Sequence, residues 1–348
     1  STQVVEQNAR VAQRCYDLVR QDVPDGFAWQ LQPQTLPPRM TITGNSAFSI
    51  GALMAGCKFV AAYPMTPATT VLEYMSLHGR NWGIVARQAE DEIAAANMAI
   101  GAAHAGVRAL VPTSGGGFDL MTEAWSLVGM TETPVVAYLG QRPGPATGLP
   151  TRTSQGDLFL ALRSSHGEFA RLVLAPHTPE EAFWCAGQSF NLAEKYQTLV
   201  VVLFDEYLAT SVRSADVEHF LPSRISIDRG KLLSVEELEP LDGYKRFAIT
   251  EDGISPRALP GMSPKAVYLT TGDEHTEEGH ITEDAGISAA MLEKRLRKEE
   301  VARADMRPPY RYGPESADVT FVGWGSTYGA IREAVDLYNA NGGSAYMV

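Results

Sequence analysis

Three short segments place polar, acidic or small residues where a strand gives way to a turn or a helix. They are AAYPMTPATT (61–70), RQAEDEIAAANM (87–98) and TSGGGF (113–118). In an open α/β sheet, the carboxyl ends of the strands line the crevice where ligands bind. The three segments therefore predict one ligand site, which we interpret as half of a cofactor site.

Glu92 is the candidate acid–base residue. It stands at the start of a predicted helix and is followed closely by three alanines, residues 94–96. Acids in the first turn also stabilise the helix dipole, by about 0.3–1 kcal/mol each, so a purely structural role is an alternative. The small neighbours would let a large ligand approach a carboxylate that can share a proton with it.

The glycines after Thr113 and Ser114 indicate close approach of the backbone to a flat ligand. Gly115, Gly116 and Gly117 carry no Cβ that would keep such a ligand away. Neither GxxxxGKS nor a GxGxxG after the first strand is present, which excludes the usual nucleotide-phosphate cradles. The same glycines are equally consistent with a tight connection between strand and helix.

Arg142 and Thr66 are candidate anion-binding residues. Arg142 follows the apolar strand PVVAYLG in a loop rich in proline and glycine, where it could clamp a carboxylate. A surface ion pair is the alternative. Thr66 precedes Pro67 and could bind the same anion, or it could cap a helix that begins at Pro67.

The composition is that of a globular protein without a nucleic-acid surface. The chain has 348 residues, 45% of them hydrophobic, which predicts two domains with cores of their own. Its net charge of -12 argues against nucleic-acid binding, which needs clustered basic residues. The one dense basic run, EKRLRKEE (293–300), alternates with acids and predicts a solvated helix face.

The three cysteines Cys15, Cys57 and Cys185 stand alone, without a CxxC pair or histidines at metal spacing. We therefore expect no metal site on this chain, and a reducing, cytoplasmic setting. No stretch reaches the length of uninterrupted apolar residues that spans a bilayer, so we expect no membrane insertion.

Strand and helix patterns alternate from Met40 to Arg213, which predicts an α/β fold with a doubly wound parallel sheet. The predicted strands are MTITG, FVAAYP, GIVARQ, RALVPT, PVVAYLG, RLVLAP and TLVVVLFDE. Residues 1–39 read as an amphipathic helix and a Pro-rich linker, and residues 214–314 as a connecting arm. Residues 315–348 read as the start of a second α/β domain, and we expect the polypeptide to be longer at both ends.

Taken together, residues 40–348 resemble the α subunit of the thiamine diphosphate-dependent 2-oxoacid:ferredoxin oxidoreductases. The most specific segments are YPMTPATT, QAEDEIAAANMAIGAAHAG, TSGGGF, QRPGPATGLPTRTSQGDL, FNLAEKYQTLVVVLFDEYL, GDEHTEEGHITED and GWGSTYGAIREA. The resemblance implies a pyrimidine-binding domain at 40–213 and the start of a transketolase C-terminal-like domain at 315–348. Met65 and Gly116 depart from the isoleucine and proline usual in the family.

The resemblance also implies roles for individual residues. Glu92 corresponds to the glutamate that protonates N1′ of the aminopyrimidine, while Thr66 and Arg142 correspond to the residues that bind the substrate. The residues expected at the cofactor are Tyr63, Pro64, Glu92, Thr113, Ser114 and Gly117.

The GDG...N pattern that holds magnesium and diphosphate in thiamine enzymes is missing, as are cluster cysteines. The resemblance therefore implies a β subunit that carries Mg²⁺, the diphosphate site and a [4Fe-4S] cluster, and it makes an attached γ domain possible. The implied activity is oxidative decarboxylation of a 2-oxoacid to acyl-CoA and CO2, with coenzyme A as co-substrate and ferredoxin as acceptor.

The QRPGPATG loop and the HGE segment after it favour 2-oxoglutarate as substrate, whose second carboxylate would need a further cation, from Arg152 or from the partner. The alternatives are a pyruvate-type oxidoreductase, a transketolase-like or dehydrogenase-like thiamine enzyme, and a non-catalytic scaffold subunit.

Overall fold

The computed structural model describes residues 2–23, 26–29 and 31–348. The chain divides into two compact units, residues 1–38 and residues 39–348. The first contains the predicted N-terminal helix, α1 (Thr2–Asp22), which buries none of its residues. Residues 31–38 of the Pro-rich segment form neither helix nor strand, as expected where prolines remove backbone donors.

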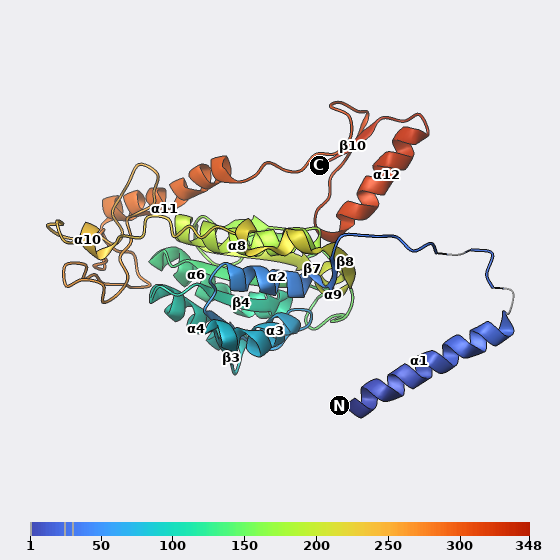
Figure 1. Ribbon diagram of the computed structural model, residues 1–348. Coiled ribbons are helices and arrows are strands. Elements are labelled where there is room, and N and C mark those ends of the chain that lie inside the picture. Colours follow the sequence, from blue (N-terminus) through green and yellow to red (C-terminus); the bar gives the residue numbers. More distant parts are fainter. Residues whose placement is uncertain (1, 24–25, 30) are drawn as a thin grey trace. The chain divides into compact units, whose positions relative to one another are not determined.

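The second unit is built on a six-stranded sheet in which all paired strands are parallel (Figure 1), so the predicted α/β class is confirmed. In spatial order the strands are β3 (Val85–Gln88), β2 (Phe59–Ala62), β4 (Ala109–Ser114), β5 (Val135–Gln141), β7 (Leu199–Asp205) and β6 (Leu172–Leu174). Strands β4, β5 and β7 are buried along their whole length, which explains their unbroken apolar runs.

Helices cover both faces of this sheet and enclose two hydrophobic cores. One core is formed by α2 (Gly44–Met54), α3 (Thr69–Gly79) and α8 (Pro179–Tyr196). The other is formed by α4 (Glu92–His104), α5 (Gly115–Leu120), α6 (Thr122–Thr131) and α7 (Leu158–Arg163). Side chains alternate along each strand, so every central strand supplies both cores. The short helix η1 (Arg80–Trp82) leads into β3, and α9 (Glu206–Thr210) follows β7.

The strand predicted at 40–44 does form, but its place in the parallel sheet was wrong. Strand β1 (Arg39–Ile42) pairs antiparallel with β8 (Arg213–Asp216) in a separate two-stranded sheet. Arg39 explains the pairing, because its guanidinium donates to the Ser214 hydroxyl (2.7 Å) and to Asp216 (2.5 Å). Strand β8 was not predicted, and it begins at the last residue of the predicted domain.

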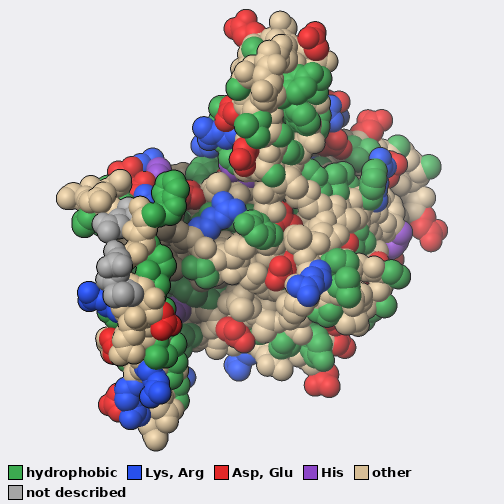
Figure 2. All heavy atoms as spheres, turned by 90° about the vertical axis from the view of Figure 1, so that its right-hand side faces the viewer, with side chains coloured by type: hydrophobic (Ala, Val, Ile, Leu, Met, Phe, Trp, Pro, Cys, Tyr) green, Lys and Arg blue, Asp and Glu red, His purple; other side chains and the backbone are tan. Residues whose placement is uncertain are grey.

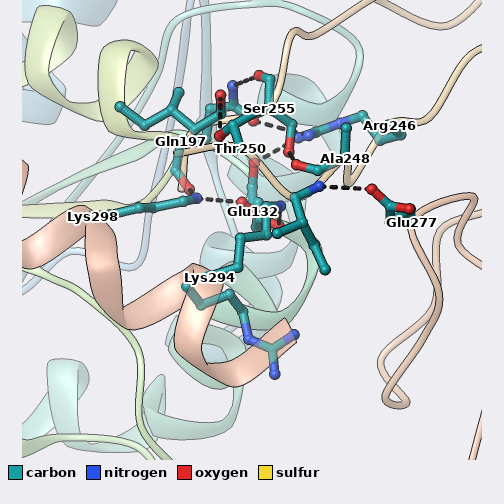
Figure 3. A network of polar contacts seen from close by, with 12 residues as sticks. Glu132, Gln197, Arg246, Ala248, Thr250, Ser255, Glu277, Lys294 and Lys298 are labelled. Atoms are coloured by element: carbon teal, nitrogen blue, oxygen red, sulfur yellow. Dashed lines mark hydrogen bonds and ion pairs between the residues drawn. The ribbon is translucent and has the colours of Figure 1, made fainter. Parts of the chain in front are cut away.

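The predicted arm contains little regular structure before a long helix. Its elements are η2 (Val217–Phe220), η3 (Pro222–Arg224), α10 (Val235–Leu238) and α11 (Ala285–Asp305). The prediction of a solvated face at 293–300 was wrong, because Lys294, Arg295 and Lys298 of α11 are buried. Glu132 explains the burial of the two lysines, since its carboxylate forms ion pairs with both ammonium groups (Figure 3).

Residues 319–347 form the predicted strand, turn, helix and strand. Strand β9 (Val319–Phe321) pairs parallel with β10 (Ala345–Met347), and η4 (Gly325–Thr327) and α12 (Tyr328–Ala340) connect them. The turn before α12 rests on the main sheet, because the Ser326 backbone N–H donates to Asp205 at the end of β7 (2.7 Å).

On the face drawn in Figure 2, acidic and basic side chains are interspersed, and the basic ones form no continuous patch. None of the helices in the described part of the chain combines the length and the apolar character needed to cross a bilayer.

Candidate active site

The order of the strands places a crevice between β2 and β4. The chain leaves β2 for the edge strand β3, then crosses back to β4 on the other side of β2. Such a reversal opens a ligand site at the carboxyl ends of the two strands that flank it. Those ends are Ala62, followed by the Tyr63–Pro67 turn, and Ser114, followed by the glycines. Two of the three predicted segments thus meet at the switch point of the sheet.

Glu92 lies in the same crevice. The Asp91 side chain caps α4 by accepting from the Ala94 backbone N–H (2.6 Å), so α4 begins at Glu92, which is 5% exposed. A Cβ on Gly117 would collide with the Thr113 hydroxyl and would lie 2.8 Å from Cγ of Glu92. The structure therefore brings Glu92, Thr113 and Gly117 together, and position 117 has room only for glycine.

The carboxylate of Glu92 accepts no hydrogen bond from any group in the described part of the chain, and the buried hydroxyl of Ser114 likewise has no partner there. Buried polar groups normally have partners. The unpartnered Ser114 hydroxyl and the Glu92 carboxylate beside Gly117 fit a polar, flat heterocycle such as an aminopyrimidine.

Hydrogen bonds from Asn45 stabilise the turn that carries Tyr63, Pro64 and Thr66. The buried Asn45 amide on α2 donates to the Pro67 carbonyl (2.8 Å) and to the Thr70 hydroxyl (2.7 Å). Its Oδ1 accepts from the Tyr138 hydroxyl of β5. Helix α3 begins at Thr69 with Ala68 as N-cap, so the alternative in which Thr66 caps a helix from Pro67 was wrong.

Replacing Asn45 by alanine should lower the free energy of unfolding by about 1–3 kcal/mol, because the Tyr138 hydroxyl and the Pro67 carbonyl lose their partner. Denaturant unfolding measures the loss. Asn97→Ala, on the exposed surface of α4, is the control and should change stability far less. Equal losses in the two variants would contradict the role given to Asn45.

Arg142 lies beside this turn, where Nη1 donates to the Thr66 carbonyl (2.9 Å). Its Nε is buried and has no hydrogen-bond partner among the described residues, and no acid there lies within ion-pair distance of it. Burial lowers the pKa of Arg142, while the nearby Asp157 acts to raise it. The alternative of a surface ion pair is therefore not observed, and Arg142 keeps donors for an incoming anion.

Two residues near the site were not predicted from the sequence. Asn45 supports the turn, and the Asp157 carboxylate lies against Gly115, where a Cβ would be 2.8 Å from its Oδ2. Asn45 could have been noticed as the one amide side chain in a helix that is otherwise made of small and apolar residues. Asp157 carried no such signal, because it follows a long loop.

The described residues contain no group of three or more His, Cys, Asp or Glu side chains arranged to hold a metal ion. Glu92, Thr113, Ser114 and Gly117 are the residues of this crevice that could hold the pyrimidine end of thiamine diphosphate.

Comparisons with known proteins agree with this geometry. Residues 50–294 match the family described as pyruvate flavodoxin/ferredoxin oxidoreductase, thiamine diphosphate-binding. The chain is 43% identical over 316 residues to the 2-oxoacid:ferredoxin oxidoreductase 1 subunit alpha of Sulfurisphaera tokodaii, covering 86% of this chain and 49% of that protein. It is 34% identical over 302 residues to the 2-oxoglutarate synthase subunit KorA of Methanothermobacter thermautotrophicus, covering 86% of this chain and 78% of that protein.

A solved structure is similar over nearly the whole fold. The 2-oxoglutarate:ferredoxin oxidoreductase from Magnetococcus marinus, with 2-oxoglutarate, coenzyme A and succinyl-CoA bound, superimposes with a TM-score of 0.87 at 36% identity, covering 92% of this chain and 55% of that chain. The chain spans about half the length of this structure and of the Sulfurisphaera relative. On these grounds the chain belongs to the family of 2-oxoacid:ferredoxin oxidoreductase α subunits, with a thiamine diphosphate-binding domain of the pyruvate flavodoxin/ferredoxin oxidoreductase type.

Proposed function

We propose that this chain supplies the pyrimidine half of a thiamine diphosphate site in an enzyme that oxidatively decarboxylates a 2-oxoacid to acyl-CoA and CO2. The observation that carries the proposal is the contact of Glu92, Thr113 and Gly117 at the switch point of the sheet, beside Arg142 and its bond to the Thr66 carbonyl. An acid for the cofactor and a cation for the substrate thus lie at neighbouring strand ends.

Glu92 holds a proton for N1′ of the aminopyrimidine and is the catalytic residue of this chain. When bound, thiamine diphosphate supplies a carbon nucleophile and accepts the electrons left by decarboxylation. Because Glu92 accepts no hydrogen bond within the described chain, its carboxylate is free to share that proton with the ring. Tyr63, Pro64, Thr113, Ser114 and Gly117 are the other residues that would hold the ring.

Arg142 binds the substrate carboxylate next to the keto group, and Thr66 contacts the same anion. Nη1 of Arg142 is already held by the Thr66 carbonyl, so its remaining donors have a fixed direction. We further propose 2-oxoglutarate as the substrate, supported by the relatives named 2-oxoglutarate synthase and 2-oxoglutarate:ferredoxin oxidoreductase. The exposed Arg152 of the same loop is the candidate cation for the second carboxylate.

A partner must complete the site. We propose a β subunit that brings Mg²⁺, the diphosphate pocket and a [4Fe-4S] cluster, with ferredoxin as electron acceptor and coenzyme A as acyl acceptor. The alpha-subunit names of the relatives support this division of labour. The same proposal includes an attached γ domain and a cytoplasmic setting. It also places the domain boundaries at 39/40, 213/214 and 314/315.

Replacing Arg142 by alanine should raise the KM for 2-oxoglutarate about 10- to 100-fold, because a charge-assisted hydrogen bond to the carboxylate contributes about 1.5–3 kcal/mol. The KM for coenzyme A should change little. Steady-state kinetics of the purified complex measures both constants, and Arg163→Ala, on the exposed surface of α7, is the matched control.

An unchanged KM for the 2-oxoacid in the Arg142 variant would contradict the substrate role. Turnover of pyruvate in preference to 2-oxoglutarate would instead favour a pyruvate-type oxidoreductase. Acyl transfer without reduction of ferredoxin would favour a transketolase-like or dehydrogenase-like enzyme.

A further inference from the structure

One nitrogen of the Gln155 side chain joins three parts of the fold that are far apart in the sequence. Gln155 lies near the end of the β5–α7 loop (residues 142–157). Its Nε2 donates to the Trp324 carbonyl in the turn before α12 (2.7 Å) and to Oδ2 of Asp205 at the end of β7 (3.1 Å). The chemistry proposed above gives these two hydrogen bonds no part.

Both acceptors of Gln155 are held in place by other contacts. Asp205 is 1% exposed, and its carboxylate also accepts from the backbone N–H groups of Leu208 (2.9 Å) and Ser326 (2.7 Å). Gly325 has a φ of +60°, and a Cβ there would lie 2.6 Å from Oδ2 of Asp205 and 2.8 Å from Nε2 of Gln155. Because only glycine allows this close approach, the turn offers Gln155 a fixed partner.

The β5–α7 loop is tied to the sheet at both ends and exposed between them. At its start, Nη1 of Arg142 donates to the Thr66 carbonyl (2.9 Å). At its end, the Asp157 backbone N–H donates to Oε1 of Gln141 in β5 (3.1 Å). Residues 144–149 between these ends are exposed. The contacts at the two ends therefore determine where the exposed part of the loop lies.

Arg152 lies on the returning limb of this loop, which we define as residues 149–157. Its exposed side chain takes part in no hydrogen bond or ion pair with the described residues, so the backbone of the limb sets its position. The limb is held by Gln155 and by a longer bond from the Tyr207 backbone N–H to the Thr153 hydroxyl (3.4 Å). Arg142 differs, because its own guanidinium is bonded to the sheet unit.

We propose that Gln155 is a positioning residue that makes the site selective for dicarboxylic 2-oxoacids. Its amide nitrogen fixes the limb that carries Arg152, and Arg152 binds the carboxylate farthest from the keto group. The inference rests on the proposed substrate roles of Arg142 and Arg152. Since Arg142 keeps an anchor of its own, loss of the Gln155 bonds weakens binding of an acid with two carboxylates more than binding of an acid with one.

The chemistry of the contact predicts which side chains can replace Gln155. Both partners, the Trp324 carbonyl and the Asp205 carboxylate, accept hydrogen bonds, so position 155 must donate. Gln155→Lys keeps a donor for both oxygens. Gln155→Met is similar in length but has no donor, and Gln155→Glu places a second carboxylate beside that of Asp205. Binding of 2-oxoglutarate should therefore be near the wild-type level in the lysine variant, weaker in the methionine variant and weakest in the glutamate variant.

The test uses the purified complex and two acids that differ in the second carboxylate. We expect Gln155→Met to raise the KM for 2-oxoglutarate about tenfold, the size of effect that loss of a hydrogen bond to a charged group produces. The inhibition constant of 2-oxobutyrate, the KM for coenzyme A and kcat should change far less. Asn81→Leu, which removes an exposed amide from η1, is the control and should leave all four constants near the wild-type values.

Hydrogen exchange of the wild-type complex gives a second test that needs no variant. Because Arg152 would contact the second carboxylate, saturating 2-oxoglutarate should slow exchange in residues 149–157 more than saturating 2-oxobutyrate does. Equal protection by the two acids would overturn the inference, even if the variants failed to fold.

The kinetic results can also contradict the inference while leaving the proposed function intact. An unchanged KM for 2-oxoglutarate in Gln155→Met, an equal loss of binding for both acids, or a lysine variant as impaired as the methionine variant would each do so. Absence of any 2-oxoacid turnover by the wild-type complex would overturn the proposed function together with this inference.

Discussion

Replacing Glu92 by glutamine is expected to slow C2 proton exchange of bound thiamine diphosphate, and overall turnover, by about 10²–10⁴-fold, the range that a positioned acid–base group contributes. Glutamine has nearly the same shape, so the contacts with Gly117 and Thr113 remain and the complex should stay assembled. It cannot hold an exchangeable proton for N1′ as a carboxylic acid does. Exchange followed by NMR in deuterated solvent measures the effect directly.

Glu90→Gln is the matched control for this prediction. Glu90 lies two residues earlier, is exposed and precedes the helix cap, so its substitution changes the net charge by the same amount. Its exchange rate should stay close to that of the wild type. If C2 proton exchange in Glu92→Gln proceeded at the wild-type rate, Glu92 would keep only the structural role of an acid at a helix start. If Glu92→Ala left the activity of the complex unchanged, a scaffold subunit would be favoured.

Replacing Glu132 by glutamine is expected to lower the free energy of unfolding by about 3–5 kcal/mol, as when one partner of a buried ion pair is removed. Glu132 is fully buried and pairs with Lys294 (2.5 Å) and Lys298 of α11 (Figure 3). Burial opposes its ionisation, yet Lys294, Lys298 and Arg246 hold the pKa of Glu132 well below its usual range. The variant would leave two ammonium groups buried without their carboxylate.

The loss should appear first in the arm that this cluster attaches to the sheet. Arg246 donates to the Glu132 carbonyl (2.8 Å) and to the Gln197 side chain (2.8 Å), while Gln197 donates to the Ser255 carbonyl (2.6 Å). Hydrogen exchange should therefore accelerate in residues 244–298 of the variant, and denaturant unfolding gives the total loss.

Two comparisons make the Glu132 prediction specific. Glu123→Gln, on the exposed surface of α6, the helix that Glu132 caps, should leave stability nearly unchanged. Replacing Glu132 by leucine together with methionine at both Lys294 and Lys298 should recover much of the loss, because apolar residues of similar volume can replace buried ion pairs. Equal stability of Glu132→Gln and the wild type would contradict the account of the cluster.

The central sheet and the edge where the ligand binds could be predicted from the sequence. At these places the apolar runs and the turn residues follow the strands of the folded chain. The apolar runs at 135–141 and 199–205 are central strands buried on both faces. The turn after Ala62 and the glycines after Ser114 follow strands that flank the switch point. In these places a residue's neighbours in sequence determine where it lies.

The errors arose where distant residues decide the outcome. Arg39 finds its partners in Ser214 and Asp216, far along the chain, so nothing near MTITG showed that this strand leaves the main sheet. The lysines of α11 are buried because Glu132, the residue that caps the end of α6, pairs with them, and spacing along α11 alone could not show this. Asp157 was missed for the same reason, since its carboxylate lies against Gly115, which is distant in the sequence.

The central claim is that this chain forms half of the active site of a 2-oxoacid:ferredoxin oxidoreductase. The most direct test is to purify the chain with its partners from the native cell and to assay 2-oxoglutarate-dependent and coenzyme A-dependent reduction of a low-potential acceptor, with wild-type and Glu92→Gln protein. The account predicts activity that accompanies a cluster-bearing, thiamine diphosphate-containing partner and is lost in the variant. A partner without iron, or activity that Glu92→Gln leaves intact, would contradict it.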